Sequence, residues 1–224
     1  MIVAIDGPAA SGKSTTAKMV AKKLKMTYLD TGAMYRAVTL ALLRSNTDLD
    51  DYDSVCQVVD ELELDIFDQG AKTVVRLDGE DVSQAIRSMP VTENVSAVSA
   101  MKYVREAMVE IQRNIGKKTN CVVEGRDIGT VVFPDAEFKI FMVADVKIRA
   151  ERRLKELHEM GDDQSLQEVM ADLKRRDKKD STRVHSPLQK AGDAIEIDTS
   201  MLSIDQQVEK VEKFINLVRE KNNK

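Results

Sequence analysis

Short apolar segments alternate along the chain with longer segments in which apolar residues recur at helical spacing. The apolar segments are residues 1–5, 26–29, 121–123, 138–143 and 194–197. Each has the length and composition of a buried parallel strand. Apolar positions separated by three or four residues mark segments 17–24, 34–41, 104–115 and 208–218. Strands that alternate with amphipathic helices predict an α/β fold, a doubly wound five-stranded parallel sheet flanked by helices.

One region changes from helical spacing to a period of two. Apolar and acidic residues alternate over residues 62–66, Gln69-Gly70 supplies a turn, and residues 73–77 form a second strand-like run. This pattern predicts an antiparallel hairpin with one solvated face. We interpret residues of about 60–90 as a small β insert, and the polar stretch 45–53 before it as a loop.

A second region, residues 146–183, is helical in pattern and crowded with Lys and Arg. The sequence Gly161-Asp162-Asp163 breaks it into two helices. A hinged basic helical pair suits a lid that closes over phosphates. We therefore expect one domain over residues 1–224, with a core (about 1–59, 91–145 and 184–224), the insert and this lid.

Composition excludes several classes of protein. Of the 224 residues, 32% are charged and 4% are aromatic, and the net charge of −4 gives no general attraction to nucleic acid or anionic membranes. Two widely separated cysteines, Cys56 and Cys121, form no zinc or redox motif. We find neither a signal peptide nor an apolar run of the ~18 residues of a membrane span. We expect a cytoplasmic monomer that binds neither membrane nor nucleic acid.

A phosphate-binding motif follows the first predicted strand. Residues 7–14 match G-x-x-x-x-G-K-[ST], and they lie between a strand and an amphipathic helix, as this motif requires. The loop amides would cradle phosphates at the positive end of the helix dipole. Lys13 would reach the β- and γ-phosphates, and the Ser14 hydroxyl would bind Mg²⁺. The expected ATP-binding residues here are Gly7, Pro8, Ala9, Ala10, Ser11, Gly12, Lys13, Ser14 and Thr15.

Two further polar sequences also follow predicted strands, namely Asp30-Thr31-Gly32 and Gly125-Arg126-Asp127. Ligands of doubly wound sheets bind beyond the carboxyl ends of the strands, so these sequences and the phosphate loop should share one crevice. Arginines near it can grip phosphate with two parallel hydrogen bonds. Arg176 and Arg183 share a helix face with Asp180, although a solvated face of ion pairs would give the same spacing.

Several motifs together narrow the class of P-loop protein. The chain lacks the Asn-Lys-x-Asp and Asp-x-x-Gly motifs of GTPases and the Leu-Ser-Gly-Gly-Gln signature of transporter ATPases. It contains IDGPAASGKST (5–15), LDTGAMYR (29–36), GRDIGTVVFPDA (125–136), Arg176-Asp177-x-x-Asp180-x-x-Arg183, Pro187-Leu188 and Asp193-Ala194. Together these motifs resemble those of the bacterial cytidylate kinase family. The resemblance extends from residue 2 to about residue 198, and the insert corresponds to an extra three-stranded sheet of that family.

The resemblance implies ATP-dependent phosphorylation of CMP and dCMP, and it assigns roles by position. The acceptor phosphate would be held by Thr31, Tyr35, Arg36, Arg126 and Arg183. The cytosine would be read by Ser96, Arg105 and Asp127, and the sugar would be held by Arg176 and Asp180. The lid over the ATP phosphates would contribute Arg149, Arg152 and Arg153.

The expected chemistry is in-line phosphoryl transfer, in which Lys13, Arg126, Arg183 and Mg²⁺ neutralise charge. The acceptor phosphate is already a nucleophile, so no general base is required. A Walker B aspartate is missing, because the nearest apolar run ends in Glu124. We therefore expect Ser14, phosphate and water to supply most Mg²⁺ ligands, with Asp30 as an outer partner or a helix cap.

Two alternatives remain open at the level of sequence. Another small-molecule P-loop kinase, for instance one that acts on an acidic metabolite, would share the phosphate loop and the arginines. A nucleic-acid-associated ATPase could use the basic helices of residues 147–183 as a binding face, although net acidity and few aromatic residues disfavour it.

Overall fold

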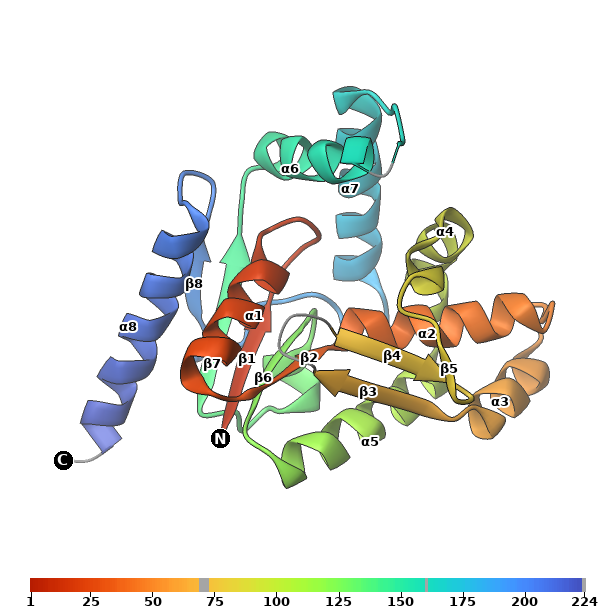
Figure 1. Cartoon of the computed structure of the whole chain (residues 1–224), viewed down its shortest axis with the longest axis horizontal. Helices are drawn as coiled ribbons and strands as arrows, with labels where there is room; N and C mark the ends of the chain where they lie inside the picture. Colours follow the sequence, from red (N-terminus) through yellow and green to blue (C-terminus); the bar gives the residue numbers. More distant parts are fainter. Residues whose placement is uncertain (69–72, 160, 223–224) are drawn as a thin grey trace.

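The computed structural model describes residues 1–68, 73–159 and 161–222. Its centre is a five-stranded parallel sheet in the order β2-β6-β1-β7-β8, which confirms the predicted fold class (Figure 1). The strands are β1 (Ile2–Asp6), β2 (Thr27–Asp30), β6 (Cys121–Gly125), β7 (Phe138–Val143) and β8 (Ile195–Asp198). All residues of β1 and β6 are buried, as apolar runs covered on both faces must be.

Helices cover both faces of this sheet. On one face, α1 (Lys13–Leu24) and α8 (Ile204–Asn222) pack on Val3 and Ile5. On the other, α2 (Thr31–Arg44) and α5 (Lys102–Lys118) pack on Ala4 and Val123. The two apolar layers alternate along β1 because neighbouring side chains of a strand point to opposite faces. Each helix matches a segment predicted from apolar spacing.

The insert contains a three-stranded antiparallel sheet in the order β3-β4-β5. Its strands are β3 (Leu64–Asp68), β4 (Thr73–Leu77) and β5 (Glu80–Asp81). The predicted hairpin is confirmed, whereas its predicted turn at Gln69-Gly70 lies outside the described residues. Val75 and Leu77 of β4 pack with Ala37 and Leu40 of α2, so the small sheet is anchored on the core helix that begins at the crevice.

Two helices beside the insert were not predicted. The stretch 45–53, expected as a loop, ends earlier, because Asp51 caps α3 (Tyr52–Glu61) by accepting a hydrogen bond from the Ser54 amide. Downstream, the 3₁₀ turn η1 (Ala85–Arg87) leads into α4 (Met89–Val98), with a proline in its first turn. Pro90 therefore begins a helix where it was expected to end the insert. Ser96, expected at a helix start, lies near the end of α4.

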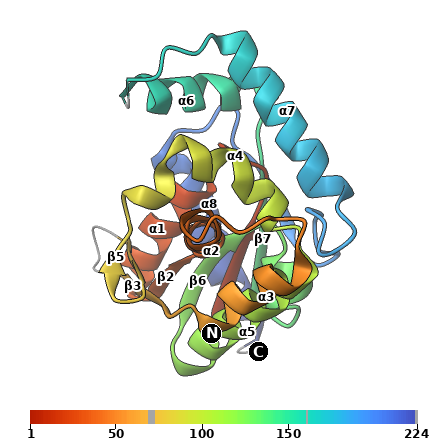
Figure 2. The same cartoon turned by 90° about the vertical axis from the view of Figure 1, so that its right-hand side faces the viewer.

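The basic segment forms the predicted helical pair, α6 (Val146–Glu159) and α7 (Leu166–Thr182). Gly161 adopts a left-handed conformation (φ 80°) in the turn between them. The two helices share a small apolar core that includes Ala150, Leu157, Val169 and Leu173. Figure 2 shows the pair arching above the end of the sheet near α4. Among the described residues, no helix combines the length and apolar content needed to cross a bilayer.

Candidate active site

The phosphate loop connects β1 to α1, and its glycines are required by close contacts. Gly12 is left-handed (φ 87°), and a Cβ there would lie 2.7 Å from Oε1 of Gln207. The same oxygen accepts a hydrogen bond from the Thr16 hydroxyl at 2.9 Å, which fixes α8 against the first turn of α1. A Cβ at Gly7 would lie 2.2 Å from the Met142 carbonyl oxygen. Contacts with β7 and α8 therefore hold this short loop in its conformation, and they leave no space for a side chain at Gly7 or Gly12.

Buried hydrogen bonds tie the carboxyl ends of three neighbouring strands together. Asp6, at the end of β1, accepts the amides of Ile128 and Gly129 at 2.8 Å each, in the turn η2 (Ile128–Val132). Thr31 donates its hydroxyl proton to the Glu124 carbonyl at 2.7 Å, which joins β2 to β6. Burial raises the pKa of Asp6 to about 6, because desolvation outweighs these two amide hydrogen bonds. The three loops that the sequence placed at one crevice are thus physically linked.

Glu124 is a site residue that sequence reasoning did not assign. Its carboxylate is buried (3% exposed), and Oε2 accepts the Ser14 hydroxyl at 2.7 Å. Its other oxygen, Oε1, accepts the hydroxyl of Tyr28. Burial, with a smaller contribution from Asp30, raises the pKa of Glu124. The signal available in the sequence was an acidic residue directly after a buried strand; it was passed over because that residue is not aspartate.

Asp30 acts as a helix cap in this structure. Its Oδ1 accepts the Ala33 amide at 3.0 Å, which satisfies a free donor in the first turn of α2. This is one of the two roles that the sequence allowed.

A pocket of about 780 Å³ lies where these loops meet the α6–α7 pair. All ten residues expected to hold the acceptor nucleotide line it, namely Thr31, Tyr35, Arg36, Ser96, Arg105, Arg126, Asp127, Arg176, Asp180 and Arg183. The residues expected to bind ATP form the donor side of the pocket. Those that line it are Ala9, Ala10, Gly12, Lys13, Ser14, Thr15, Arg152 and Arg153. Four others expected to bind ATP do not line it, namely Gly7, Pro8, Ser11 and Arg149. The predicted common crevice is confirmed.

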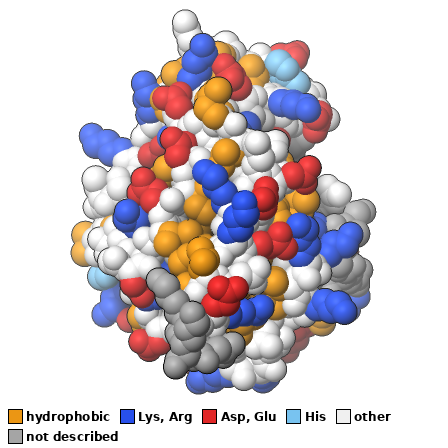
Figure 3. Space-filling view, turned by 90° about the vertical axis from the view of Figure 1, so that its left-hand side faces the viewer, with side chains coloured by type: hydrophobic (Ala, Val, Ile, Leu, Met, Phe, Trp, Pro, Cys, Tyr) orange, Lys and Arg blue, Asp and Glu red, His pale blue; other side chains and the backbone are white. Residues whose placement is uncertain are grey.

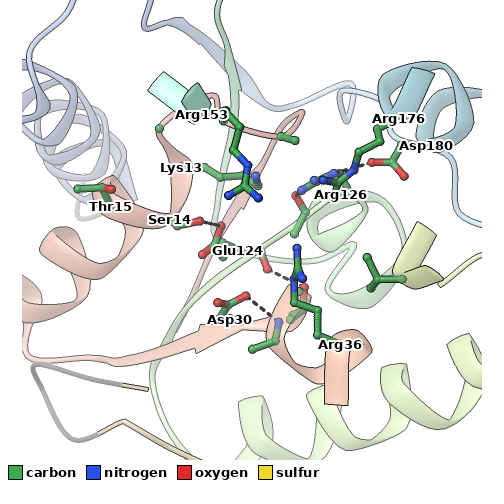
Figure 4. Close-up of a pocket in the computed structure, with 18 of the residues that line it drawn as sticks. Lys13, Ser14, Thr15, Asp30, Arg36, Glu124, Arg126, Arg153, Arg176 and Asp180 are labelled. Atoms are coloured by element: carbon green, nitrogen blue, oxygen red, sulfur yellow. Dashed lines mark hydrogen bonds and ion pairs between the residues drawn. The ribbon is translucent and has the colours of Figure 1, made fainter. Parts of the chain in front are cut away.

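Positive side chains converge in this pocket (Figure 4). Lys13, Arg36 and Arg153 point toward a common space that Arg126 and Arg176 border from the opposite side. Burial and then neighbouring Arg126 lower the pKa of Lys13 to about 8. Burial and then Arg176 lower the pKa of Arg36 to about 10, and the pKa of Arg176 itself is lowered by burial and Arg126. A bound polyanion would reduce the electrostatic repulsion between these buried positive charges.

At the far end of the pocket, two arginines surround one buried carboxylate. Arg105 forms an ion pair with Asp127, and Nη2 of Arg183 lies 3.6 Å from the other oxygen of Asp127. The Arg105 guanidinium also stacks over the Tyr35 ring, 5.3 Å from its centroid. Four buried polar atoms here have no hydrogen-bond partner in the described part of the chain, namely Tyr35 Oη, Ser96 Oγ, Arg105 Nε and Arg183 Nη2. A polar ligand would satisfy them.

Beside that carboxylate, Nε of Arg126 donates to Oδ2 of Asp180 at 2.9 Å. The ion pair between Arg176 and Asp180 that helical spacing allowed is therefore not the one formed. Arg183 lies just beyond the last residue of α7, in an extended conformation. Its placement depends on the chain turning there: Nε donates to the Ser186 carbonyl at 2.6 Å.

Two of the three arginines expected over the ATP phosphates hold the chain itself. Arg149 donates to the Ala9 carbonyl at 3.2 Å and pairs with Asp177 at 2.7 Å, so it connects the phosphate loop to both helices of the pair. Arg152 donates to the carbonyl and hydroxyl oxygens of Thr199 at 2.6 and 3.1 Å. Arg153 pairs with Glu156 at 3.0 Å and is the arginine of α6 that Figure 4 places beside Lys13.

Known proteins match this sequence over nearly its whole length. The family model described as cytidylate kinase matches residues 3–217. The cytidylate kinase of Clostridioides difficile is 48% identical over 217 residues, covering 97% of this chain and 99% of that protein. The cytidylate kinase of Bacillus thuringiensis is 50% identical over 210 residues, covering 93% of each chain.

A solved structure supports the fold alone. An uncharacterised protein from Eubacterium ventriosum aligns with a TM-score of 0.51 at 14% identity, over 96% of this chain and 98% of that one. The family follows from the sequence matches, which span nearly the whole chain. The chain belongs to the cytidylate kinase family.

Proposed function

We propose that the protein transfers the γ-phosphoryl group of ATP to CMP or dCMP, giving ADP and CDP or dCDP. The observation that carries the proposal is the two-sided pocket. One side is a phosphate loop with a buried lysine, and the other is a set of desolvated arginines around a carboxylate. A hydrolase needs no second anion site opposite the phosphate loop, whereas a kinase needs one to bind the phosphate of its nucleotide acceptor.

The transfer would be an in-line displacement. An oxygen of the acceptor phosphate forms a bond to the γ-phosphorus while the bond to the β,γ-bridging oxygen breaks, and ADP leaves with that electron pair. A phosphate monoester has its second pKa near 6, so the acceptor needs no general base at neutral pH. Lys13 on the donor side, with Arg126 and Arg183 on the acceptor side, would stabilise the charge that spreads over the transferred group.

Discrimination for cytosine would come from Asp127 and Arg105. Cytosine presents an amino donor at N4 beside acceptors at N3 and O2. A carboxylate oxygen of Asp127 could accept from N4, while the unpartnered Nε of Arg105 could donate to the acceptors. Uracil would place a carbonyl against the carboxylate, and buried sites of this kind reject such analogues by up to roughly 10⁴-fold. The remaining oxygen of Asp180, with Arg176, would hold the sugar.

The residues on the donor side fit a divalent cation bound with ATP. In the described chain, no three His, Cys, Asp or Glu side chains gather closely enough to hold a metal alone, so phosphate and water oxygens would complete the set. Ser14 offers a hydroxyl oxygen at the start of α1, held at 2.7 Å by a buried carboxylate. When bound, Mg²⁺ would neutralise part of the β- and γ-phosphate charge.

The experiment is a coupled assay of ADP release with ATP and each of CMP, dCMP, UMP, AMP and shikimate. The proposal predicts rapid turnover with CMP and dCMP only. Equal turnover of all acceptors would exclude the cytidine assignment, and fast turnover of shikimate alone would indicate another small-molecule kinase.

The same assay addresses the nucleic-acid alternative. Stimulation by polynucleotide and not by CMP would favour it. Acidic and basic side chains are interspersed on the face drawn in Figure 3, which gives a polynucleotide no continuous basic track there.

A further inference from the structure

We propose that Tyr28 is a positioning residue for the metal-binding hydroxyl of Ser14, acting through Glu124. Tyr28 holds the Glu124 carboxylate in the orientation in which it accepts a hydrogen bond from the Ser14 hydroxyl. This inference rests on the proposed function, because it takes Ser14 to meet a divalent cation that arrives with ATP.

The sheet register brings the two side chains together. Tyr28 of β2 pairs with Val122 of β6, and Glu124 lies two residues further along β6. Side chains two residues apart on a strand point to the same face, so Tyr28 and Glu124 are diagonal neighbours on the face covered by α1. Aromatic side chains are long enough to reach a diagonal neighbour. The hydroxyl of Tyr28 spans this gap and donates to Oε1 of Glu124.

Burial makes this hydrogen bond consequential. Tyr28 is 5% exposed and Glu124 is 3% exposed, so bulk solvent competes little for this hydrogen bond. Each carboxylate oxygen has a neutral hydroxyl donor, one from β2 and one from α1. Two donors from different elements restrict the side-chain torsions of Glu124 more than one donor would, because rotation about its last bond has only a weak intrinsic preference.

A competing partner for the carboxylate is close by. The charge of Glu124 favours the protonated form of Lys13 and so raises its pKa, yet Nζ of Lys13 donates to the Pro8 carbonyl at 3.1 Å. Without the Tyr28 hydroxyl, Oε1 would be free to turn toward that ammonium group. The hydrogen bond from Tyr28 therefore keeps Glu124 directed at Ser14 and keeps Lys13 available for phosphate.

The affinity for the cation would depend on the orientation of the Ser14 hydroxyl. A hydroxyl that donates its proton to a carboxylate turns its lone pairs away from that carboxylate, where a cation can accept them. Loss of an outer partner that orients a metal ligand typically lowers metal affinity by about 10- to 100-fold. A ring that served only to fill the apolar layer beneath α1 would have no such effect.

Tyr28→Phe separates these roles, because it keeps the ring and removes only the hydroxyl. Binding of a non-hydrolysable ATP analogue is measured by calorimetry with Mg²⁺ and with EDTA, without CMP. We expect the gain in affinity due to Mg²⁺ to fall about tenfold, while affinity in EDTA stays unchanged. An unchanged gain, or an equal loss in both buffers, would overturn the role of Tyr28.

The matched control is Tyr103→Phe. It also removes a hydroxyl-to-carboxylate hydrogen bond, from Tyr103 to Oδ1 of Asp60, but at an exposed site outside the pocket. This variant should keep the full gain from Mg²⁺. A loss equal to that of Tyr28→Phe would show that the effect is not specific to Glu124, and would overturn the proposal.

A second variant tests whether Tyr28 acts through Glu124, and it also serves if Tyr28→Phe proves too unstable to titrate. Glu124→Asp shortens the side chain so that it cannot bridge both hydroxyls, and it should lose a similar part of the Mg²⁺ gain. Adding Tyr28→Phe to it should cause no further loss. Additive losses would contradict the inference. Because CMP is absent, failure of the proposed kinase activity would not alter these outcomes.

Discussion

The donor and acceptor sides of the pocket are assembled in opposite ways. On the donor side, the phosphate loop is one continuous stretch, residues 7–15, in the turn between β1 and the first residues of α1, and only Arg152 and Arg153 come from elsewhere. The acceptor side draws its arginines from α2, α5, the β6–η2 turn, α7 and the segment after α7. The first is fixed by backbone conformation, whereas the second exists only once distant segments have folded together.

This difference has an electrostatic counterpart. The phosphate loop presents backbone amides and one lysine, and its conformation is held by neutral contacts such as that between Thr16 and Gln207. The acceptor side places like charges close together: burial and then Arg176 lower the pKa of Arg36, and burial and then Arg126 lower the pKa of Arg176. Its two buried acids, Asp127 and Asp180, offset only part of that charge. An anionic ligand supplies the rest.

The largest expected effect comes from the donor side. Lys13→Met removes the only side-chain charge of the phosphate loop and leaves the loop backbone intact. We expect kcat for CMP to fall by ~10²–10³-fold or more, as for other lost transition-state contacts. Steady-state kinetics measures the change, and Lys22→Met, on the exposed face of α1, is the matched control. A near-normal kcat in Lys13→Met would refute the assigned role.

The donor side could be predicted from sequence because its motif is local. Spacing and the strand–loop–helix context fix residues 7–14, and apolar periodicity located every strand of the main sheet. The common crevice also followed from topology, since loops after parallel strands must meet at one edge. Two short helices were not predicted, because α3 begins inside a polar stretch and α4 has Pro90, which suggests the end of an element, in its first turn.

The sequence predicts the location of the acceptor side but not the ion pairs within it. Sequence could not show that Asp127 is shared by Arg105 and Arg183, or that Asp180 pairs with Arg126 and not with Arg176, because these partners lie far apart along the chain. Arg149 and Arg152 likewise bind the chain, a contact that depends on how α6 packs. Glu124 was not assigned for a different reason: it follows a buried strand where the motif predicts aspartate, and its hydrogen bonds come from Ser14 and Tyr28 on other elements.

The next largest effect tests the acceptor side. Asp127→Asn keeps the shape of the side chain and replaces one carboxylate oxygen with a donor. We expect the ratio of kcat/KM for CMP over UMP to fall about 100-fold, while the KM for ATP changes little. An unchanged ratio would count against base recognition by Asp127. The substitution to Ala is less informative, because leaving two buried arginines unpaired would itself cost about 3–5 kcal/mol of stability.

A third test addresses Asp6, whose hydrogen bonds to the Ile128 and Gly129 amides connect the strand before the phosphate loop to the turn after β6. Asp6 has a folded-state pKa raised from 3.8 to about 6, so its contribution to stability is complete below pH 4 and is lost as pH rises to about 6. The difference amounts to about 2–3 kcal/mol. Asn at this position does not titrate. Urea unfolding of both proteins should therefore show wild type losing that much relative to Asp6→Asn between pH 4 and pH 7, and a constant difference would contradict the raised pKa.

The smallest expected effect concerns closure over both sides. The α6–α7 pair has only a small apolar core of its own, and Arg149 and Arg152 fasten its base to the phosphate loop and to Thr199. We propose that the pair is a lid, because Arg153 beside Lys13 would gain phosphate partners when both nucleotides are bound. Ligand-dependent closure would then protect amides of α6.

Hydrogen exchange provides the measurement. With CMP and a non-hydrolysable ATP analogue at about ten times their dissociation constants, amides of residues 149–159 should exchange about tenfold more slowly. The exposed helix α3, remote from the pocket, is the internal control and should not change. Protection of the phosphate loop without protection of α6 would remove the lid. The donor side would then bind its nucleotide without closing on the acceptor side.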